Sequence, residues 1–185
     1  MTQPQIRNSH MNFNEVCFYT STVVSWKKLF KTDNLKAIIT DCLKNLVERK
    51  LIIVYGFVIM PNHIHIIWEL NSMNGKELPD TSFNKFTAHQ FKRELQANHP
   101  QILELDCFMS DKNDRAYQFW QRDPLAVKIF SREMMMQKLD YLHLNPLHER
   151  WNLADRPENY YWSSAKFYET GVDNFGFLTH FMEKF

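Results

Sequence analysis

Glycine, proline and long apolar runs are all scarce in this sequence. Its 185 residues include only 4 glycines and 7 prolines, and no segment repeats or is biased in composition, which argues against solenoids and disordered linkers. No apolar run approaches the roughly eighteen residues that a membrane span requires, and the polar N-terminus lacks the apolar region of a signal peptide. We therefore expect a cytoplasmic protein without a membrane partner.

Cysteine and net charge are equally sparse. Cys17, Cys42 and Cys107 lie far apart and form no CxxC pair, so neither a zinc knuckle nor a disulfide framework is indicated, and we expect all three to be reduced and structural. The net charge is only +1, which excludes a strongly basic nucleic-acid-binding domain. Any DNA-binding surface must therefore be local.

Apolar residues, by contrast, are plentiful. The hydrophobic content of 44% and the aromatic content of 15% are ample for one packed core, whereas the chain is short for two ordinary domains. We predict a single domain over residues 1–185, with its core at about 13–146 and a C-terminal tail at about 147–185.

The hydrophobic pattern changes its period along the first half of the chain. Residues 13–26 are rich in β-branched and aromatic residues and predict a strand, and an amphipathic helix follows to about residue 50, capped by Thr32 or Asp33. The nearly continuous apolar run at 51–60 predicts a strand buried on both faces. Proline and asparagine favour turns, so residues 63–70 should return as an antiparallel strand.

The second half of the chain begins with a predicted helix. We expect this helix at residues 82–97 and an irregular stretch at 98–115. Two short strands should follow, at 117–120 and at 127–130. Ser131 can cap a helix over 131–145, which must end there because Pro146 cannot continue it, and a short helix follows near Ser163. This order predicts an α+β fold, a ferredoxin-like (RRM-like) antiparallel sheet with helices on one face and an appended C-terminal helix.

Two histidines stand two apart on one predicted strand. His63 and His65 should project from the same face, while Ile64 and Ile66 project from the other. Two adjacent neutral imidazoles can chelate a divalent metal such as Mg²⁺ or Mn²⁺ if oxygen ligands complete the site. Taken alone the pattern is a weak signal, because a pair of half-exposed histidines on a polar sheet face would look the same.

A tyrosine and an asparagine stand four apart near the end of a predicted helix. Tyr141 and Asn145 should lie on one helical face, one turn from each other. Asn145 could supply an oxygen ligand that the histidines lack, and Tyr141 could supply a nucleophile that forms a covalent intermediate. An isolated helical tyrosine is more often a core residue with its hydroxyl at the rim. His143 falls on another side of the helix and is left out of the site.

A locally basic segment could contact DNA. Residues 82–93 carry Lys85, Lys92 and Arg93 without an acidic residue, alternating with phenylalanines. A solvated helix face with a buried aromatic stripe explains this spacing equally well. Arg122 in the FWQRD segment is a further candidate, since it could touch DNA or pair with Asp123.

Several short motifs, in this order, resemble one family. MPNHIH, KFTAHQFK, FWQRD, YLHLNP and YYWSS together resemble the single-tyrosine HUH transposases, and most closely the REP-associated tyrosine transposases of bacteria. The resemblance runs from about residue 13 to 168. It implies a bacterial DNA transposase whose sheet carries the histidine pair beside a helix that carries the nucleophile, with a divalent metal between them. This chain departs from the family pattern in its long 98–115 stretch and in its low overall positive charge.

By motif position, the resemblance makes His63 and His65 metal ligands, Asn145 the third ligand and Tyr141 the nucleophile. The implied reaction nicks and rejoins single-stranded or hairpin-flanked DNA through a 5′-phosphotyrosine, and a 3′-hydroxyl then reseals the strand without ATP. Three other hypotheses stay open at this point. The chain could be a non-catalytic single-stranded nucleic-acid-binding module, a metal-dependent hydrolase in which water attacks, or a domesticated or decayed copy that keeps the fold but is silent. The sequence also leaves a monomer and a homodimer equally open.

Overall fold

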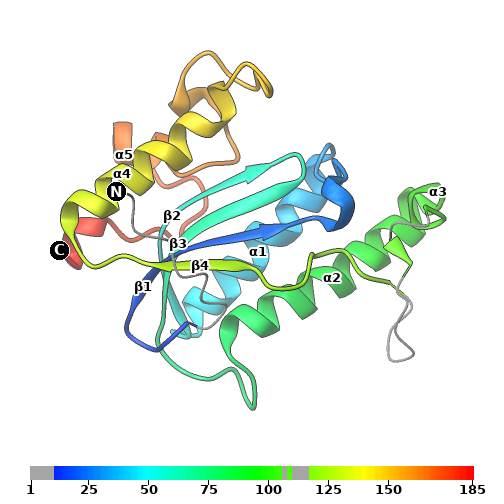
Figure 1. Ribbon diagram of the computed structural model, residues 1–185, viewed down its shortest axis with the longest axis horizontal. Helices are drawn as coiled ribbons and strands as arrows, with labels where there is room; N and C mark the ends of the chain where they lie inside the picture. Colours follow the sequence, from blue (N-terminus) through cyan, green and yellow to red (C-terminus); the bar gives the residue numbers. More distant parts are fainter. Residues whose placement is uncertain (1–10, 106–107, 110–116) are drawn as a thin grey trace, which may run out of the picture.

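A four-stranded antiparallel sheet forms the centre of the molecule (Figure 1). The computed structural model describes residues 11–105, 108–109 and 117–185. The strands are β1 (Val16–Thr22), β2 (Ile52–Met60), β3 (His63–Leu70) and β4 (Leu125–Lys128), in the spatial order β2-β3-β1-β4. Each strand runs antiparallel to its neighbours, and the two β-α-β crossovers place β3 and β1 in the middle. The predicted ferredoxin-like topology is thereby confirmed.

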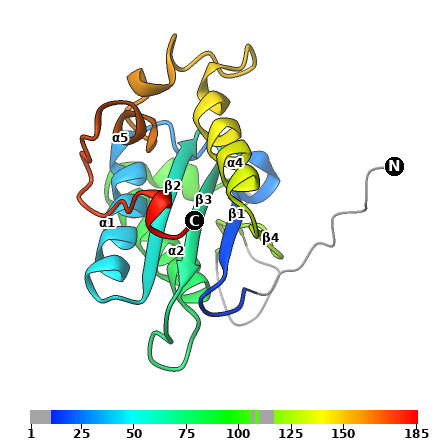
Figure 2. The same cartoon turned by 90° about the vertical axis from the view of Figure 1, so that its left-hand side faces the viewer.

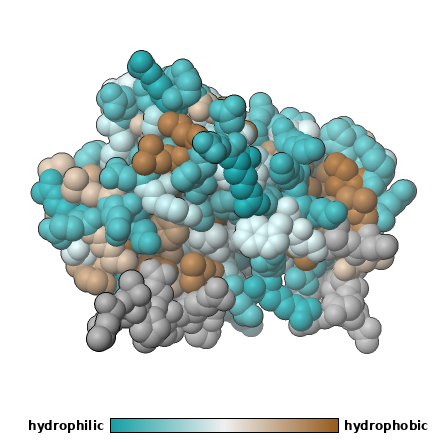
Figure 3. Space-filling model, turned by 45° about the horizontal axis from the view of Figure 1, so that its top comes forward, coloured by the Kyte–Doolittle hydropathy of each residue, from teal (hydrophilic) through white to brown (hydrophobic). Residues whose placement is uncertain are grey.

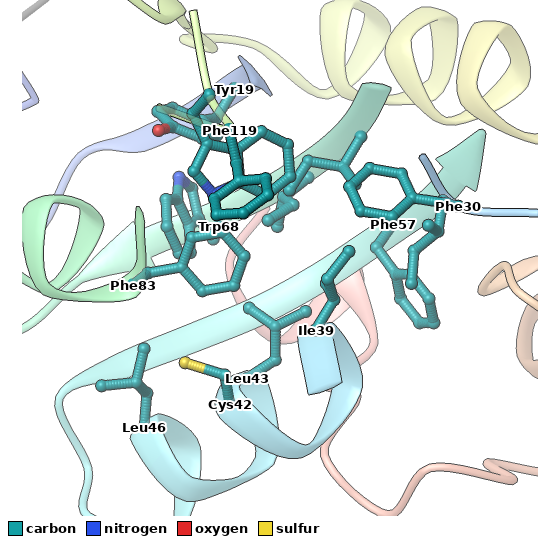
Figure 4. Packing of buried hydrophobic residues seen from close by; sticks show 14 of the residues in the cluster. Tyr19, Phe30, Ile39, Cys42, Leu43, Leu46, Phe57, Trp68, Phe83 and Phe119 are labelled. Atoms are coloured by element: carbon teal, nitrogen blue, oxygen red, sulfur yellow. The ribbon is translucent and has the colours of Figure 1, made fainter. Parts of the chain in front are cut away.

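Two helices cover one face of the sheet. They are α1 (Asp33–Glu48) and α2 (Pro79–Asn98), followed by the single turn α3 (Pro100–Leu103). Apolar residues of α1 recur every three or four positions, so that one stripe packs onto the strands (Figure 4). Trp68 of β3 lies fully buried between Tyr19 and Phe83. This layer is the larger of the two hydrophobic clusters.

The opposite face of the sheet is covered by α4 (Arg132–Leu144) and by the C-terminal segment (Figure 2). Ser131 caps α4, because its Oγ accepts a hydrogen bond from the amide of Met134 at 3.2 Å. After α4 the chain forms the short helices η3 (Asn145–Leu147), η4 (Pro157–Asn159), α5 (Ala165–Thr170) and η5 (Phe181–Glu183). The sheet is thus a middle layer between two helical ones.

Gly56 of β2 sets how closely α4 approaches the sheet. A Cβ atom there would lie 2.7 Å from Cδ2 of Leu139 and 3.3 Å from Oγ of Ser164. The register of β2 against β3 also shifts between Val54 and Gly56, as at a β-bulge. The missing side chain therefore lets α4 and the C-terminal segment settle directly on β2.

Most predicted elements are confirmed, but several boundaries differ. The strand predicted over 13–26 spans only Val16–Thr22, because Ser25 and Trp26 adopt left-handed φ angles of 54° and 56° that end it in the 3-10 turn η1 (Val24–Trp26). The second helix begins at Pro79 instead of Ser82, since proline is favoured in the first helical turn.

The predicted strand at 117–120 was wrong, because this stretch makes only isolated bridges, such as the one between Trp120 and Val23. The last strand lies at Leu125–Lys128, two residues earlier than predicted. Much of the irregular 98–115 stretch lies outside the described residues, as does Cys107. Cys17 and Cys42 are free and buried as expected. No helix within the described ranges is long and apolar enough to cross a membrane.

The close approach at Gly56 predicts a packing defect when a methyl group is added there. Gly56→Ala should lower the free energy of unfolding by about 1–3 kcal/mol, because the new Cβ overlaps the buried side chain of Leu139. Urea denaturation followed by circular dichroism measures this loss. The double variant with Leu139→Ala should be less destabilised than the sum of the two single changes. Additive losses would show that Leu139 is not what Gly56 accommodates.

Candidate active site

The two histidines of β3 lie side by side under α4. Their ring centroids are 4.7 Å apart, and both side chains are buried. Ile64 and Ile66 belong to the cluster beneath α1 and α2, so the alternation of β3 sends the histidines to the other face. The predicted shared orientation of His63 and His65 is therefore confirmed. The alternative, a pair of half-exposed histidines on a polar sheet face, is wrong because both side chains are buried.

Each imidazole has a hydrogen bond at Nδ1. Nδ1 of His63 lies 2.7 Å from Oδ1 of Asn62, and Nδ1 of His65 lies 2.7 Å from Oγ1 of Thr20. The amide oxygen of Asn62 can only accept, so His63 carries its proton on Nδ1 and presents an unprotonated Nε2. Nε2 of His65 is buried and has no hydrogen-bond partner in the described part of the chain. Partners at Nδ1 that leave Nε2 available are typical of histidines that ligate metals.

Burial keeps both imidazoles neutral. Desolvation, with a smaller contribution from the charge of Arg150, lowers the pKa of His63 to about 4. Desolvation also holds the pKa of His65 well below its usual range, with smaller contributions from the neighbouring imidazole of His63, which would repel a second proton if it were itself protonated, and from the charge of Lys138. A neutral imidazole is the form that binds a metal. At neutral pH the pair is therefore ready to ligate without first losing a proton.

Tyr141 of α4 reaches the same place from above. Its ring centroid lies 5.4 Å from that of His65 and 5.8 Å from that of Phe18, and both contacts are edge-on. With 47% of its surface exposed, Tyr141 is not the core tyrosine that its position in a helix alone would suggest. One turn earlier, the ammonium of Lys138 lies 5.1 Å from the centroid of Phe18. A phenol and a cation thus stand beside the histidines.

Asn145 stands directly after α4 and keeps a helical backbone, with φ of −54° and ψ of −43°. The helical spacing to Tyr141 therefore persists, and the turn η3 that Asn145 opens packs against β2. Its side chain is buried. No cluster of three histidine, cysteine or acidic side chains suited to a metal occurs in the described ranges. A third protein ligand beside the histidines would therefore have to be of another residue type, and the amide oxygen of Asn145 is one candidate.

The predicted DNA-contacting cations lie elsewhere. Lys85, Lys92 and Arg122 line a cavity of about 590 Å³ between α2 and residues 117–124, on the α1 and α2 side of the sheet. Lys85 is paired with Glu77, and the ammonium of Lys92 lies 5.1 Å from the ring of Tyr117. Arg93 is exposed but does not line this cavity. The structure therefore separates these cations from the histidines.

Two supporting residues escaped the sequence reasoning. Thr20 and Asn62 were given no role beyond strand and turn, yet they orient the two imidazoles. Asn62 carried a usable signal, since it directly precedes His63. Thr20 carried none, because only the pairing of β1 with β3 brings it opposite His65. His143 was rightly excluded, because its ring turns away to Ser164 and Tyr168.

Comparison with known proteins finds a likeness of fold. No protein-family model matches the sequence, and no curated protein matches it. The fold is similar to a solved structure of a REP-associated tyrosine transposase bound to a REP hairpin, with a TM-score of 0.60 and 15% sequence identity. The superposition covers 97% of this chain and 92% of that one. The chain therefore has the fold of a REP-associated tyrosine transposase.

Proposed function

We propose that this protein is a metal-dependent transposase-type enzyme that nicks and rejoins single-stranded DNA through Tyr141. The observation that carries the proposal is the meeting of three side chains from two distant segments. The ring of Tyr141 lies 5.4 Å from that of His65, and the ring of His63 lies 4.7 Å from His65. A half-exposed phenol beside two buried, neutral imidazoles supports a covalent reaction more than simple binding.

His63 and His65 would hold a divalent ion, Mg²⁺ or Mn²⁺, through Nε2, with the amide oxygen of Asn145 as third ligand. The donor set fits such an ion, because Nε2 of His65 is buried without a partner in the described part of the chain, and its lone pair is free when Nδ1–H donates to Thr20. When bound, the ion supplies a positive charge that polarises an oxygen of the scissile phosphate. Thr20 and Asn62 hold the rings in the required orientation.

Tyr141 carries out the covalent step. Its phenolic oxygen gives up its proton and attacks phosphorus, forming the new O–P bond while the bond from phosphorus to the 3′-oxygen breaks. The departing 3′-oxygen takes up a proton, and the 5′ end of the strand remains on Tyr141 as a phosphotyrosine. Because this bond is a phosphodiester like the one it replaced, a 3′-hydroxyl can attack it and restore the strand. One exposed tyrosine thus serves one strand at a time.

The proposed substrate is single-stranded DNA next to a hairpin. The similar transposase structure is bound to a REP hairpin, which supports a hairpin partner for this chain as well. The cations at the other face, Lys85, Lys92, Arg93 and Arg122, would then contact DNA outside the cleaved position. The proposal leaves open whether one chain or two build the complete site.

Removing the phenolic oxygen should abolish the covalent product alone. We expect Tyr141→Phe to give no denaturation-resistant adduct with hairpin-bearing oligonucleotides in Mn²⁺, while wild type gives one that gel electrophoresis resolves. Because the ring is kept, Mn²⁺ binding measured by calorimetry should stay unchanged. Strand cleavage that persists in Tyr141→Phe would instead indicate hydrolysis by water.

Removing both histidines should eliminate metal binding. His63→Ala with His65→Ala takes away the imidazole ligands, so the Mn²⁺ binding heat seen for wild type should disappear in calorimetry. Since buried histidines also fill space, thermal unfolding of the variant is measured in parallel. Unchanged Mn²⁺ affinity in a folded double variant would contradict the proposed site. A protein that binds hairpin DNA without Mn²⁺ binding or adduct would be a nucleic-acid-binding module.

The hydroxyl of Thr20 offers a subtler test. Thr20→Val keeps the shape of the side chain but removes the partner of His65 Nδ1, so Mn²⁺ affinity should fall by about 10–100-fold. Thr22→Val is the matched control, because Thr22 lies two residues along the same face of β1 and pairs with His63 through the backbone alone. Equal effects of the two substitutions on calorimetric affinity would exclude an orienting role for Thr20.

A further inference from the structure

The segment after β1 is held firmly against the turn between β2 and β3. The amide of Val23 donates to the carbonyl of Asn62 at 2.9 Å, and that of Phe30 donates to Pro61 at 2.9 Å. The side chain of Asn62 also donates to the carbonyl of Trp26 at 3.1 Å. Asn62 thereby connects His63 to a turn with two consecutive left-handed residues. Lys28 follows that turn, so its position relative to His63 is fixed by the backbone.

The segment after α4 brings an aromatic ring to the same place. The indole of Trp151 lies 5.9 Å from the imidazole of His63, between centroids. Two cations lie over this indole, the ammonium of Lys28 at 5.6 Å and the guanidinium of Arg150 at 4.9 Å. Residues that are more than a hundred positions apart in sequence therefore surround one half-exposed aromatic ring next to His63.

These two cations form no ion pair in the part of the chain that the structure describes. Lys28 and Arg150 are both exposed. One cation would be enough to complement the indole, whereas a second like charge adds repulsion. Figure 3 shows a molecular surface that is mostly hydrophilic, with hydrophobic patches that stay separate. An anion is the ligand that two exposed cations beside one ring would attract.

We propose that Lys28, Arg150 and Trp151 form a nucleotide subsite that binds a base and its phosphates next to the cleaved phosphodiester. The base stacks on the indole, and the two cations bind the two phosphates that flank this base, one cation to each. Stacking combined with cationic contacts is how single strands are bound without base-specific recognition. This inference rests on the proposed function, because it assigns the substrate contact beside the histidine pair. A free nucleotide would lack the second flanking phosphate, so the subsite favours a strand.

The contact can be measured apart from catalysis. In the Tyr141→Phe background, a fluorescein-labelled single-stranded oligothymidylate is titrated and its anisotropy followed at several NaCl concentrations. Trp151→Leu should weaken binding about tenfold, because stacking on the indole is lost. Trp151→Phe should recover most of the affinity, since phenylalanine also presents an aromatic face. Thermal unfolding confirms that both variants are folded.

The cations have a distinct signature. Lys28→Gln with Arg150→Gln should reduce the slope of log Kd against log NaCl by about 1.4, because each lost phosphate contact removes roughly 0.7. The matched control is Lys50→Gln with Lys76→Gln, two exposed lysines at the opposite end of β2 and β3 that carry the same charge change. A slope that falls equally in both double variants would overturn the inference, as would unaltered binding by Trp151→Leu.

Adduct formation by proteins that keep Tyr141 separates the two proposals. If wild type forms the adduct but the subsite variants bind the oligonucleotide like wild type, the nucleotide subsite is wrong and the proposed reaction stands. If wild type forms no adduct while the subsite variants lose binding, the reaction is wrong and the subsite is a single-strand binding surface. When both are right, the subsite variants need a higher DNA concentration for half-maximal adduct.

Discussion

The alternation of side chains along β3 is the constraint on which the rest of the structure depends. Successive residues of a strand point to opposite faces, so Ile64 and Ile66 enter the core under α1 and α2 while His63 and His65 face α4. A shift of register by one residue would exchange the two sets and bury the histidines among apolar side chains. The pairing of β3 with both β1 and β2 along nearly its whole length prevents such a shift.

Close packing of α4 completes what the strand begins. Histidines on an open sheet face would be solvated and would titrate near their ordinary pKa, whereas beneath a helix desolvation keeps them neutral. Gly56 allows that helix to lie directly on β2, and the contact carries Tyr141 to His65. The C-terminal segment is also bound to the sheet, because the ammonium of Lys184 pairs with the buried carboxylate of Glu69 in β3 at 2.9 Å. Fold and site are therefore products of the same contacts.

The sequence predicted the helices and strands better than the tertiary contacts between them. Local hydrophobic periodicity was sufficient to predict the order of strands and helices along the chain and the shared face of His63 and His65. Pro146 was sufficient to predict where α4 ends. The same reasoning failed at residues 117–120, where apolar residues bury themselves beside α2 without joining the sheet. Thr20 and Trp151 have no local signature at all, because only tertiary pairing brings them to the histidines. Short-range rules reach one element at a time.

The site combines neutral imidazoles with nearby cations. The imidazoles are neutral at physiological pH, so they contribute no positive charge toward a phosphate. Lys138 stands by Phe18 on the Tyr141 side, and Lys28 stands by Trp151 on the other. Each cation lies against an aromatic ring. The ring attracts the cation but, unlike a carboxylate, does not neutralise its positive charge. A strand that crossed the histidines would therefore meet one cation on the Tyr141 side and another on the Trp151 side. The net charge of +1 for the whole chain gives no sign of these cations beside the histidines, which only the tertiary structure brings there.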